Sequence, residues 1–316
     1  MQIPFYKTRN VRETIQLGSN LAKILMPGDA LFFFGNLGAG KTHFIKGVAQ
    51  GLGIKEIIKS PTYAFVKSYT FKKEIFYHYD LYRAHDTHGL EALGIFESLE
   101  NPRSIHAIEW SEHLNGKFPE RRLEITMEAH DDCHTIRIHR VDPEAASLSA
   151  VPSFYKRFDT HAVIQKHCAQ VARAAMAIAE AMMRLFKIVD VDLLCAAALS
   201  HDVMKLQKKH AEAMADFLVE QGYPKTAALV RLHNVTALLE RPKAFDTVEK
   251  KILYYADKRV AHDKIVSVQE RLEEGRKRWL KKGAPPLKYT SLEVDRAVLK
   301  LERELFKGLD IKPEDI

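Results

Sequence analysis

Apolar residues follow two different patterns along the chain, and the change between them falls near residue 142. Before it, short apolar runs of strand length alternate with turn residues and helical stretches. The expected strands span residues 30–35, 64–69, 75–79 and 105–110, with an alternating pair at 123–127 and 135–138 that predicts a hairpin, and the expected helices span 43–52 and 90–99. This pattern predicts an α/β domain with a central, mostly parallel sheet.

The second half of the chain favours helices. Residues 141–153 are small and polar and include two prolines, which is typical of a linker, and strand patterns almost disappear after them. In residues 166–183 apolar side chains recur at helical spacing, and His167 lies on the same face. We therefore expect an α/β domain at residues 1–142, a linker at 143–155 and an all-α domain at 156–316.

Composition limits the location and the partners of the protein. No apolar run approaches the ~20 residues that a membrane-spanning helix needs, and the N-terminus lacks the order of a signal peptide, so we expect a cytoplasmic protein without a membrane partner. The three cysteines form no CxxC pair, which suggests neither a disulfide framework nor a thiolate zinc site. The net charge is +7, and most of the positive excess follows residue 142, which fits binding to phosphates or RNA.

Residues 35–42 carry a phosphate-binding motif. The sequence GNLGAGKT matches G-x-x-x-x-G-K-[ST] and stands between an expected strand and an expected helix, as the mechanism requires. Backbone N–H groups of such a loop surround phosphate oxygens at the helix N-terminus. Lys41 is expected to reach the β- and γ-phosphates, and the Thr42 hydroxyl to coordinate Mg²⁺. The expected nucleotide contacts are Gly35, Asn36, Leu37, Gly38, Ala39, Gly40, Lys41, Thr42 and His43.

Two acidic residues follow at the ends of expected strands, Asp80 in FYHYDLYR and Glu109 in HAIEW. Phosphate-side ligands of open α/β sheets collect at such positions. Together with GLG at 51–53 and SPTY at 60–63, these segments resemble the TsaE (YjeE) family of bacterial P-loop ATPases, which assist synthesis of the threonylcarbamoyladenosine modification in tRNA. The resemblance covers nearly all of residues 1–142 and implies a P-loop NTPase fold.

This resemblance implies a role for each matching residue. Asp80 would help to hold Mg²⁺, Thr62 would act as a switch residue near the γ-phosphate, Glu109 would be needed for ATP turnover, and Trp110 would lie beside the nucleotide. It also implies ATP and Mg²⁺ as cofactors, TsaB- and TsaD-type proteins as partners, and an indirect relation to tRNA.

The chain departs from the family pattern at two positions. Asn36 stands where Asp is usual, and His43 where a second Thr is usual. Both flank the phosphates, so binding should survive although turnover could change.

The second half carries a series of histidines and aspartates: His167, His201, Asp202, His210, His233 and Asp257. Imidazole and carboxylate together suit Fe, Mn, Zn or Co better than Ca. Asp257 lies in the apolar segment ILYYADK and His167 on an apolar helix face, where an unpaired polar group is costly. A shared cation would relieve both costs.

The order H…HD…D resembles the HD superfamily of metal-dependent phosphohydrolases over about residues 158–260, and Lys205 extends the pair to HDxxK. The additional His210 and His233 resemble a two-metal subgroup that includes hydrolases of diadenosine tetraphosphate. By this resemblance Asp202 would bridge two metals and Lys205 would face the substrate phosphate. The remaining ligands would divide as His167, His201 and Asp257 on one metal, and His210 and His233 on the other. Two metals would clamp the attacking and leaving oxygens.

These features favour a fusion of a TsaE-like ATPase with an HD phosphohydrolase that acts on a phosphorylated small molecule, first of all a nucleotide, with one or two transition metal ions. Two other interpretations of the second half remain open: a phosphodiesterase acting on RNA or a cyclic nucleotide, and a metal-stabilised docking module without turnover. A further alternative is an RNA-binding adaptor that uses the basic run RKRWLKK at 276–282. This run ends a charged stretch that predicts an exposed helix, followed by a turn at Gly283 and Pro285.

Overall fold

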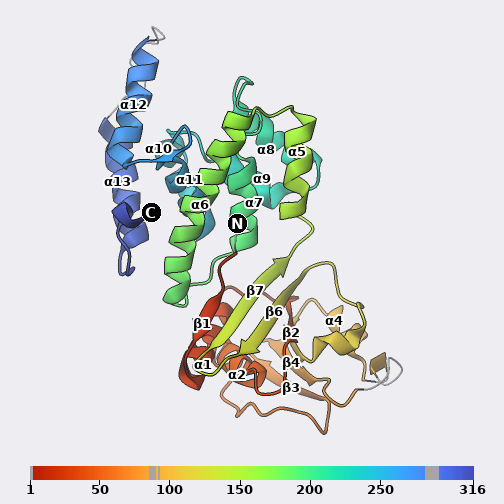
Figure 1. Ribbon diagram of the computed structural model, residues 1–316. Coiled ribbons are helices and arrows are strands. Elements are labelled where there is room, and N and C mark those ends of the chain that lie inside the picture. Colours follow the sequence, from red (N-terminus) through yellow and green to blue (C-terminus); the bar gives the residue numbers. More distant parts are fainter. Residues whose placement is uncertain (1–2, 85–89, 92, 282–291) are drawn as a thin grey trace. The chain divides into compact units, whose positions relative to one another are not determined.

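The computed structural model describes residues 3–84, 90–91, 93–281 and 292–316 (Figure 1). The chain forms two compact units, one of Phe5–Asp142 with Phe186–Ile188 and the other mainly of Pro143–Leu185 and Val189–Ile316. An α/β unit with a mostly parallel sheet is followed by a helical unit, which confirms the fold class expected from the sequence.

A seven-stranded sheet forms the frame of the first unit, with the order β1-β7-β6-β2-β5-β4-β3. The strands are β1 Tyr6–Thr8, β2 Ala30–Phe34, β3 Val66–Phe71, β4 Glu74–Asp80, β5 Ser104–Glu109, β6 Arg122–Ala129 and β7 His134–Val141. β6, β2, β5 and β4 run parallel, whereas β1, β7 and β3 pair antiparallel with their neighbours. Because β2, β5 and β4 are parallel, their carboxyl ends meet at one edge of the sheet, where ligands bind in open α/β folds.

Two helices of the first unit, α1 Val11–Ala22 and α2 Lys41–Leu52, pack against each other (Figure 1). A Cβ at Gly47 would lie 2.0 Å from the carbonyl oxygen of Ile15, so the two backbones approach more closely than a larger residue allows. Sequence patterns predict no element before residue 30, and β1 and α1 are therefore additions. Of the helix expected over 90–99, the described residues contain α4 Ile95–Leu99.

The second unit is helical apart from a two-stranded hairpin, β8 Val260–Ala261 and β9 Lys264–Ile265. Its helices are α5 Val151–Arg157, α6 Ala162–Arg184, α7 Val191–Ser200, α8 His210–Glu220, α9 Pro224–Val230, α10 Ala237–Glu240, α11 Val248–Asp257, α12 Val268–Lys281 and α13 Leu292–Phe306. None of the helices in the described part of the chain is both long and apolar enough to cross a membrane.

Two segments of this unit bear on the expected boundaries. α5 begins at Val151, inside the expected linker, and Phe154 packs edge-on against Phe217 with ring centroids 5.6 Å apart. The turn expected at Gly283 and Pro285 lies outside the described residues.

Candidate nucleotide site and metal centre

The phosphate-binding motif lies between the end of β2 and the start of α2. Gly35, Gly38 and Gly40 have φ angles of 135°, 83° and 91°, a region that glycine enters without steric cost. At Gly35 a Cβ would stand 2.1 Å from the carbonyl oxygen of Met127, so β6 leaves no space for a side chain. Leu37 is exposed and Ala39 is buried. The loop therefore presents backbone at the N-terminus of α2, where an anion is favoured.

Lys41, the first residue of α2, is buried at 4% exposure. Its Nζ donates to the carbonyl oxygens of Gly35 at 2.5 Å and Asn36 at 3.1 Å, and it lies 3.7 Å from the centre of the Trp110 ring. Burial lowers the pKa of Lys41, while three carboxylates, of which Glu109 acts most strongly, oppose the shift. Loop carbonyls and an indole ring thus hold the ammonium group where the motif expects phosphate oxygens.

Glu109, at the end of β5, accepts hydrogen bonds from two sides. The Thr42 hydroxyl donates to its two oxygens at 2.8 and 3.1 Å, and His78 Nε2 lies 2.9 Å from Oε1. His78 is completely buried, and its Nδ1 has no hydrogen-bond partner. Since a carboxylate only accepts, Nε2 is the donor in this hydrogen bond. The sequence motif alone predicts no role for His78. It stands two residues before Asp80, however, so the two side chains lie on the same face of the strand.

Asp80 ends β4 directly beside Glu109, because the two residues are paired in the parallel register of β4 and β5. Its Oδ2 accepts from the Thr62 hydroxyl at 2.6 Å and from the Ser60 hydroxyl, and Oδ1 accepts from the Tyr82 N–H. The structure therefore brings Thr42, Asp80, Thr62 and Glu109 together at the carboxyl edge of the sheet, next to the loop. These oxygens suit Mg²⁺.

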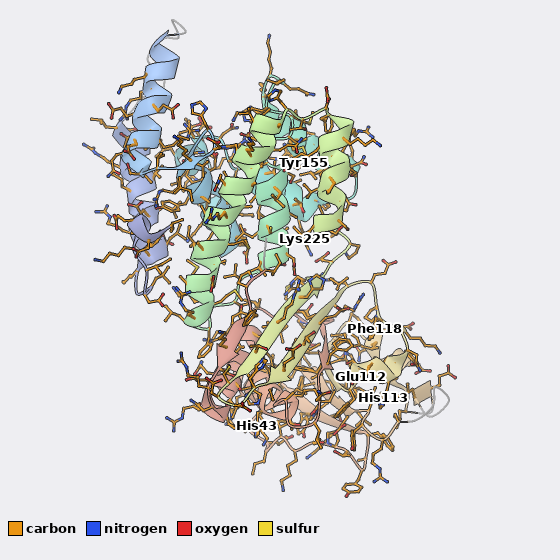
Figure 2. All side chains as sticks on the ribbon, viewed as in Figure 1. His43, Glu112, His113, Phe118, Tyr155 and Lys225 are labelled. Atoms are coloured by element: carbon orange, nitrogen blue, oxygen red, sulfur yellow. The ribbon has the colours of Figure 1, made fainter. Side chains whose placement is uncertain are left out.

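His43 follows Thr42 on α2 and is labelled in Figure 2. It is partly buried, and burial, with lesser contributions from Lys46 and His134, lowers its pKa. A mainly neutral imidazole therefore stands where a threonine is usual.

Six side chains of the second unit converge on one site. They are His167 on α6, His201 and Asp202 directly after α7, His210 at the start of α8, His233 after α9 and Asp257 at the end of α11. Asp202 Oδ1 lies 3.2 Å from His233 Nε2 and 3.3 Å from His210 Nε2, and Oδ2 lies 3.6 Å from both His167 and His201. Asp257 Oδ1 lies 3.3 Å from His167 Nε2.

Two triplets in this cluster have ligand spacing, His167–His201–Asp202 and Asp202–His210–His233, each with ligand atoms within 4.8 Å of one another. Asp202 belongs to both triplets. The arrangement can hold one cation or a pair that shares this carboxylate.

Backbone carbonyls orient three of the imidazoles. The Nδ1 atoms of His201, His233 and His167 lie 2.8, 2.6 and 2.7 Å from the carbonyl oxygens of Ala198, Val230 and His262. A carbonyl only accepts, so each Nδ1 donates a proton to it and each ring turns its Nε2 toward the carboxylates. Nε2 of His201 and of His233 is buried without a hydrogen-bond partner. Imidazole nitrogens and carboxylate oxygens that face one another in a buried site form a donor set that suits a cation between them.

Charge also favours a cation here. Burial opposes ionisation of Asp202, but its histidine neighbours, His201 foremost, outweigh burial and hold its pKa well below the ordinary value. Burial opposes protonation of His201 as well, yet Asp202, with smaller contributions from Cys168 and Asp257, outweighs burial and raises the pKa of His201 well above its ordinary value. The protein thus stabilises positive charge at this position, as a metal ligand set does.

Lys258 and the β8–β9 hairpin support the cluster and were missed from sequence. Lys258 is buried, and its Nζ donates to Asp257 Oδ2 at 2.5 Å and to the His233 carbonyl at 2.7 Å. Burial lowers the pKa of Lys258. His262 has an exposed side chain, but its carbonyl oxygen accepts from His167 Nδ1. Any residue at position 262 would supply this backbone carbonyl, so the sequence gives no indication of the contact.

The basic run at 276–282 is described only at its start. Arg276 pairs with Asp295 at 2.5 Å, and Lys277 pairs with Glu273 at 3.0 Å one turn earlier on α12. Residue 282 and the side chains of 278–281 lie outside the described part. The two described cations are thus already paired with carboxylates.

Comparisons with known proteins divide the chain between two families. Residues 8–137 match the family model described as threonylcarbamoyl adenosine biosynthesis protein TsaE, and residues 164–262 match the HD domain. A Haemophilus influenzae protein described as tRNA threonylcarbamoyladenosine biosynthesis protein TsaE is 36% identical over 129 residues, which cover 39% of this chain and 81% of that protein. A Bacillus subtilis protein of the same description is 37% identical over 127 residues, 40% of this chain and 78% of its own length. The crystal structure of Bacillus subtilis YdiB shares 32% identity, covers 45% of this chain and 87% of its own, and gives a TM-score of 0.38.

Proposed function

The chain belongs to the family of the threonylcarbamoyl adenosine biosynthesis protein TsaE, and from that premise we propose that its first unit is a Mg²⁺-dependent ATPase serving threonylcarbamoyladenosine modification of tRNA. Its partners are proteins of the TsaB and TsaD type, and tRNA is engaged through them. The observation that carries the proposal is the pairing of Asp80 with Glu109, whose carboxylate accepts a hydrogen bond from the Thr42 hydroxyl.

Each residue of this site has a defined task. Lys41, now on the loop carbonyls, would bind the β- and γ-phosphates, and Thr42 and Asp80 would hold Mg²⁺. With the Thr42 hydroxyl used as a Mg²⁺ ligand, Glu109 would be free to orient water, and His78 would keep that carboxylate in place through its Nε2–H. Thr62, which is hydrogen-bonded to Asp80, would respond to the presence of the γ-phosphate. Trp110 would lie against the nucleotide when Lys41 binds phosphate instead of the indole ring.

Nucleotide binding tests this proposal. Lys41→Ala should weaken ATP binding on the order of 100-fold, because one charged donor to phosphate contributes up to ~3 kcal/mol. Lys55→Ala removes an exposed lysine outside the motif and serves as the matched control. ATP affinity measured by calorimetry that is equal in both variants would contradict the site.

For the second unit we propose a metal-dependent phosphohydrolase of phosphorylated small molecules, supported by the match to the HD domain and by the shared position of Asp202 in two ligand triplets. His167, His201 and Asp257 would hold one ion, His210 and His233 a second, and Asp202 both. Bound divalent ions would lower the pKa of water and stabilise charge on phosphoryl oxygens. Lys205, whose Nζ lies 2.8 Å from Asp202 Oδ2, would be available to the substrate phosphate when that carboxylate is a metal ligand.

Metal content is the direct test. The purified protein should hold about two equivalents of Fe, Mn, Zn or Co by elemental analysis, and Asp202→Ala should lose them together with phosphatase activity. Asp216→Ala removes an exposed carboxylate of the same unit and should retain both. An Asp202→Ala protein with full metal content would refute the bridging role.

A further inference from the structure

A small cavity opens beside the candidate metal centre. Its walls include His167 and Asp202, the cations Lys205 and Arg271, and the apolar Val163 and Ile164. The volume is about 120 Å³. One water occupies about 30 Å³ of liquid, so this space fits about four waters or one phosphoryl group. Pockets that enclose a whole drug-sized ligand begin at about 300 Å³, so most of a larger substrate remains outside.

Arg271 reaches the cavity from the start of α12. Its Nε donates to the Val260 carbonyl at 2.7 Å, which anchors the side chain and leaves the terminal N–H groups of the guanidinium for an anion. Within the described part of the chain Arg271 makes no ion pair, whereas Arg276 and Lys277 on the same helix are paired with carboxylates.

Charge around the cavity favours a ligand with several negative charges. Two carboxylates, Asp202 and Asp257, lie among three cations, Lys205, Lys258 and Arg271. Each divalent ion at the ligand cluster would add two positive charges, which only a polyanion offsets. A terminal phosphate carries about 1.5 to 2 negative charges near neutral pH, whereas a phosphodiester carries about one.

We propose that Lys205 and Arg271 form an anion clamp that binds a terminal phosphoryl group, so that the substrate is a phosphate monoester or the end of a nucleoside polyphosphate rather than an internal phosphodiester. This inference rests on the proposed function of the second unit. Val163 and Ile164, which line the same cavity, would contact the less polar part of the substrate.

Phosphate binding tests the clamp without turnover. Inorganic phosphate is titrated by calorimetry into Mn²⁺-loaded full-length protein that carries Lys41→Ala, so that the P-loop contributes little. Arg271→Gln should weaken binding about 10- to 100-fold, as expected for loss of a charge-assisted hydrogen bond. Lys277→Gln removes the same charge from a solvent-facing position on α12 and should leave the affinity within about twofold.

Two further measurements separate binding from support of the hairpin. Manganese content should be equal in the Arg271 and Lys277 variants, and the metal-loaded protein should hydrolyse p-nitrophenyl phosphate faster than its bis-ester. Metal loss in Arg271→Gln would mean that Arg271 only supports the hairpin that orients His167, and this would overturn the clamp. Unchanged phosphate affinity, or preference for the diester, would overturn it as well. A wild-type protein that binds no metal would instead refute the proposed metal centre.

Discussion

The imidazole of His106 lies inside the sheet of the first unit and makes its stability depend on pH. His106 is on β5, 1% exposed, and stacks on Tyr77 with ring centroids 5.2 Å apart and 9° between the planes. Ser104 Oγ, 3.5 Å from Nε2, is a distant polar neighbour. Burial lowers the pKa of His106 from 6.5 to about 4. His106→Gln removes the titrating group.

The size of the effect follows from the two pKa values. Above pH 6.5 the imidazole is neutral in both the folded and the unfolded chain. As the pH falls below 6.5, the unfolded chain binds a proton that the folded chain excludes until about pH 4, so the unfolding free energy falls. The loss is about 2 kcal/mol at pH 5 and reaches about 3.4 kcal/mol below pH 4. The His106→Gln variant does not show this pH-dependent loss, but without the stacked ring it is less stable by about 0.5 to 1.5 kcal/mol at every pH.

Urea unfolding of the full-length protein at about pH 7.5 and pH 5, followed by hydrogen exchange of peptides from β4 and β5, measures this effect. At about pH 7.5 the wild-type protein should have a larger unfolding free energy than His106→Gln. At about pH 5 this difference should change by about 2 kcal/mol in favour of His106→Gln. His130→Gln, which removes a half-exposed imidazole of the same unit, is the matched control for loss of a histidine. Parallel pH dependence of the wild-type protein and His106→Gln would refute the reasoning.

Further expectations concern the two sites and the α1–α2 contact. His78→Leu should lower kcat for ATP hydrolysis about 10- to 100-fold and leave ATP affinity within about twofold. His78→Gln keeps a hydrogen-bond donor and should recover most of kcat. An equal loss of kcat in both variants would exclude a role for the hydrogen bond to Glu109. Gly47→Ala should cost about 1 to 3 kcal/mol in urea unfolding, whereas Gly275→Ala, whose nearest added contact is 4.0 Å away, should cost nothing; equal stabilities would contradict the close approach. Removing bound metal with a chelator should destabilise the second unit by about 2.7 kcal/mol, for free metal at about 100 times its Kd before chelation. In Asp202→Asn, thermal unfolding should be the same with and without the chelator.

The geometry of the first candidate site could be predicted where it is local in sequence. GNLGAGKT contains a glycine loop, a helix start and Lys41 within eight residues. The pairing of Asp80 with Glu109 could not be derived in this way, because it depends on β4 and β5 being neighbours, which is set by sheet topology. The resemblance to a family supplied their grouping instead.

Elements without strong apolar patterns were missed. β1 has three residues, too few to establish an alternation. α1 packs on α2 through small residues such as Gly18, where a Cβ would lie 2.2 Å from the Phe44 carbonyl oxygen. Close backbone contact replaces part of the large apolar stripe that sequence analysis uses to recognise a helix.

In the second unit, local sequence determines how a ligand is presented, and helix packing determines whether the ligands meet. His201 and His233 each stand three residues after the carbonyl that accepts their Nδ1–H, Ala198 at the end of α7 and Val230 at the end of α9. Carbonyls of a last helical turn lack later N–H partners within the helix, so a histidine at this spacing is held with Nε2 directed outward.

His167 has no such local support and depends on the His262 carbonyl, 95 residues later in the chain. Its orientation therefore requires the folded hairpin, and so does the presentation of Arg271, which donates to Val260 of the same hairpin. Hence a change that loosens β8–β9 should reduce metal affinity through His167 before it affects His201 or His233, whose supports lie within their own helices.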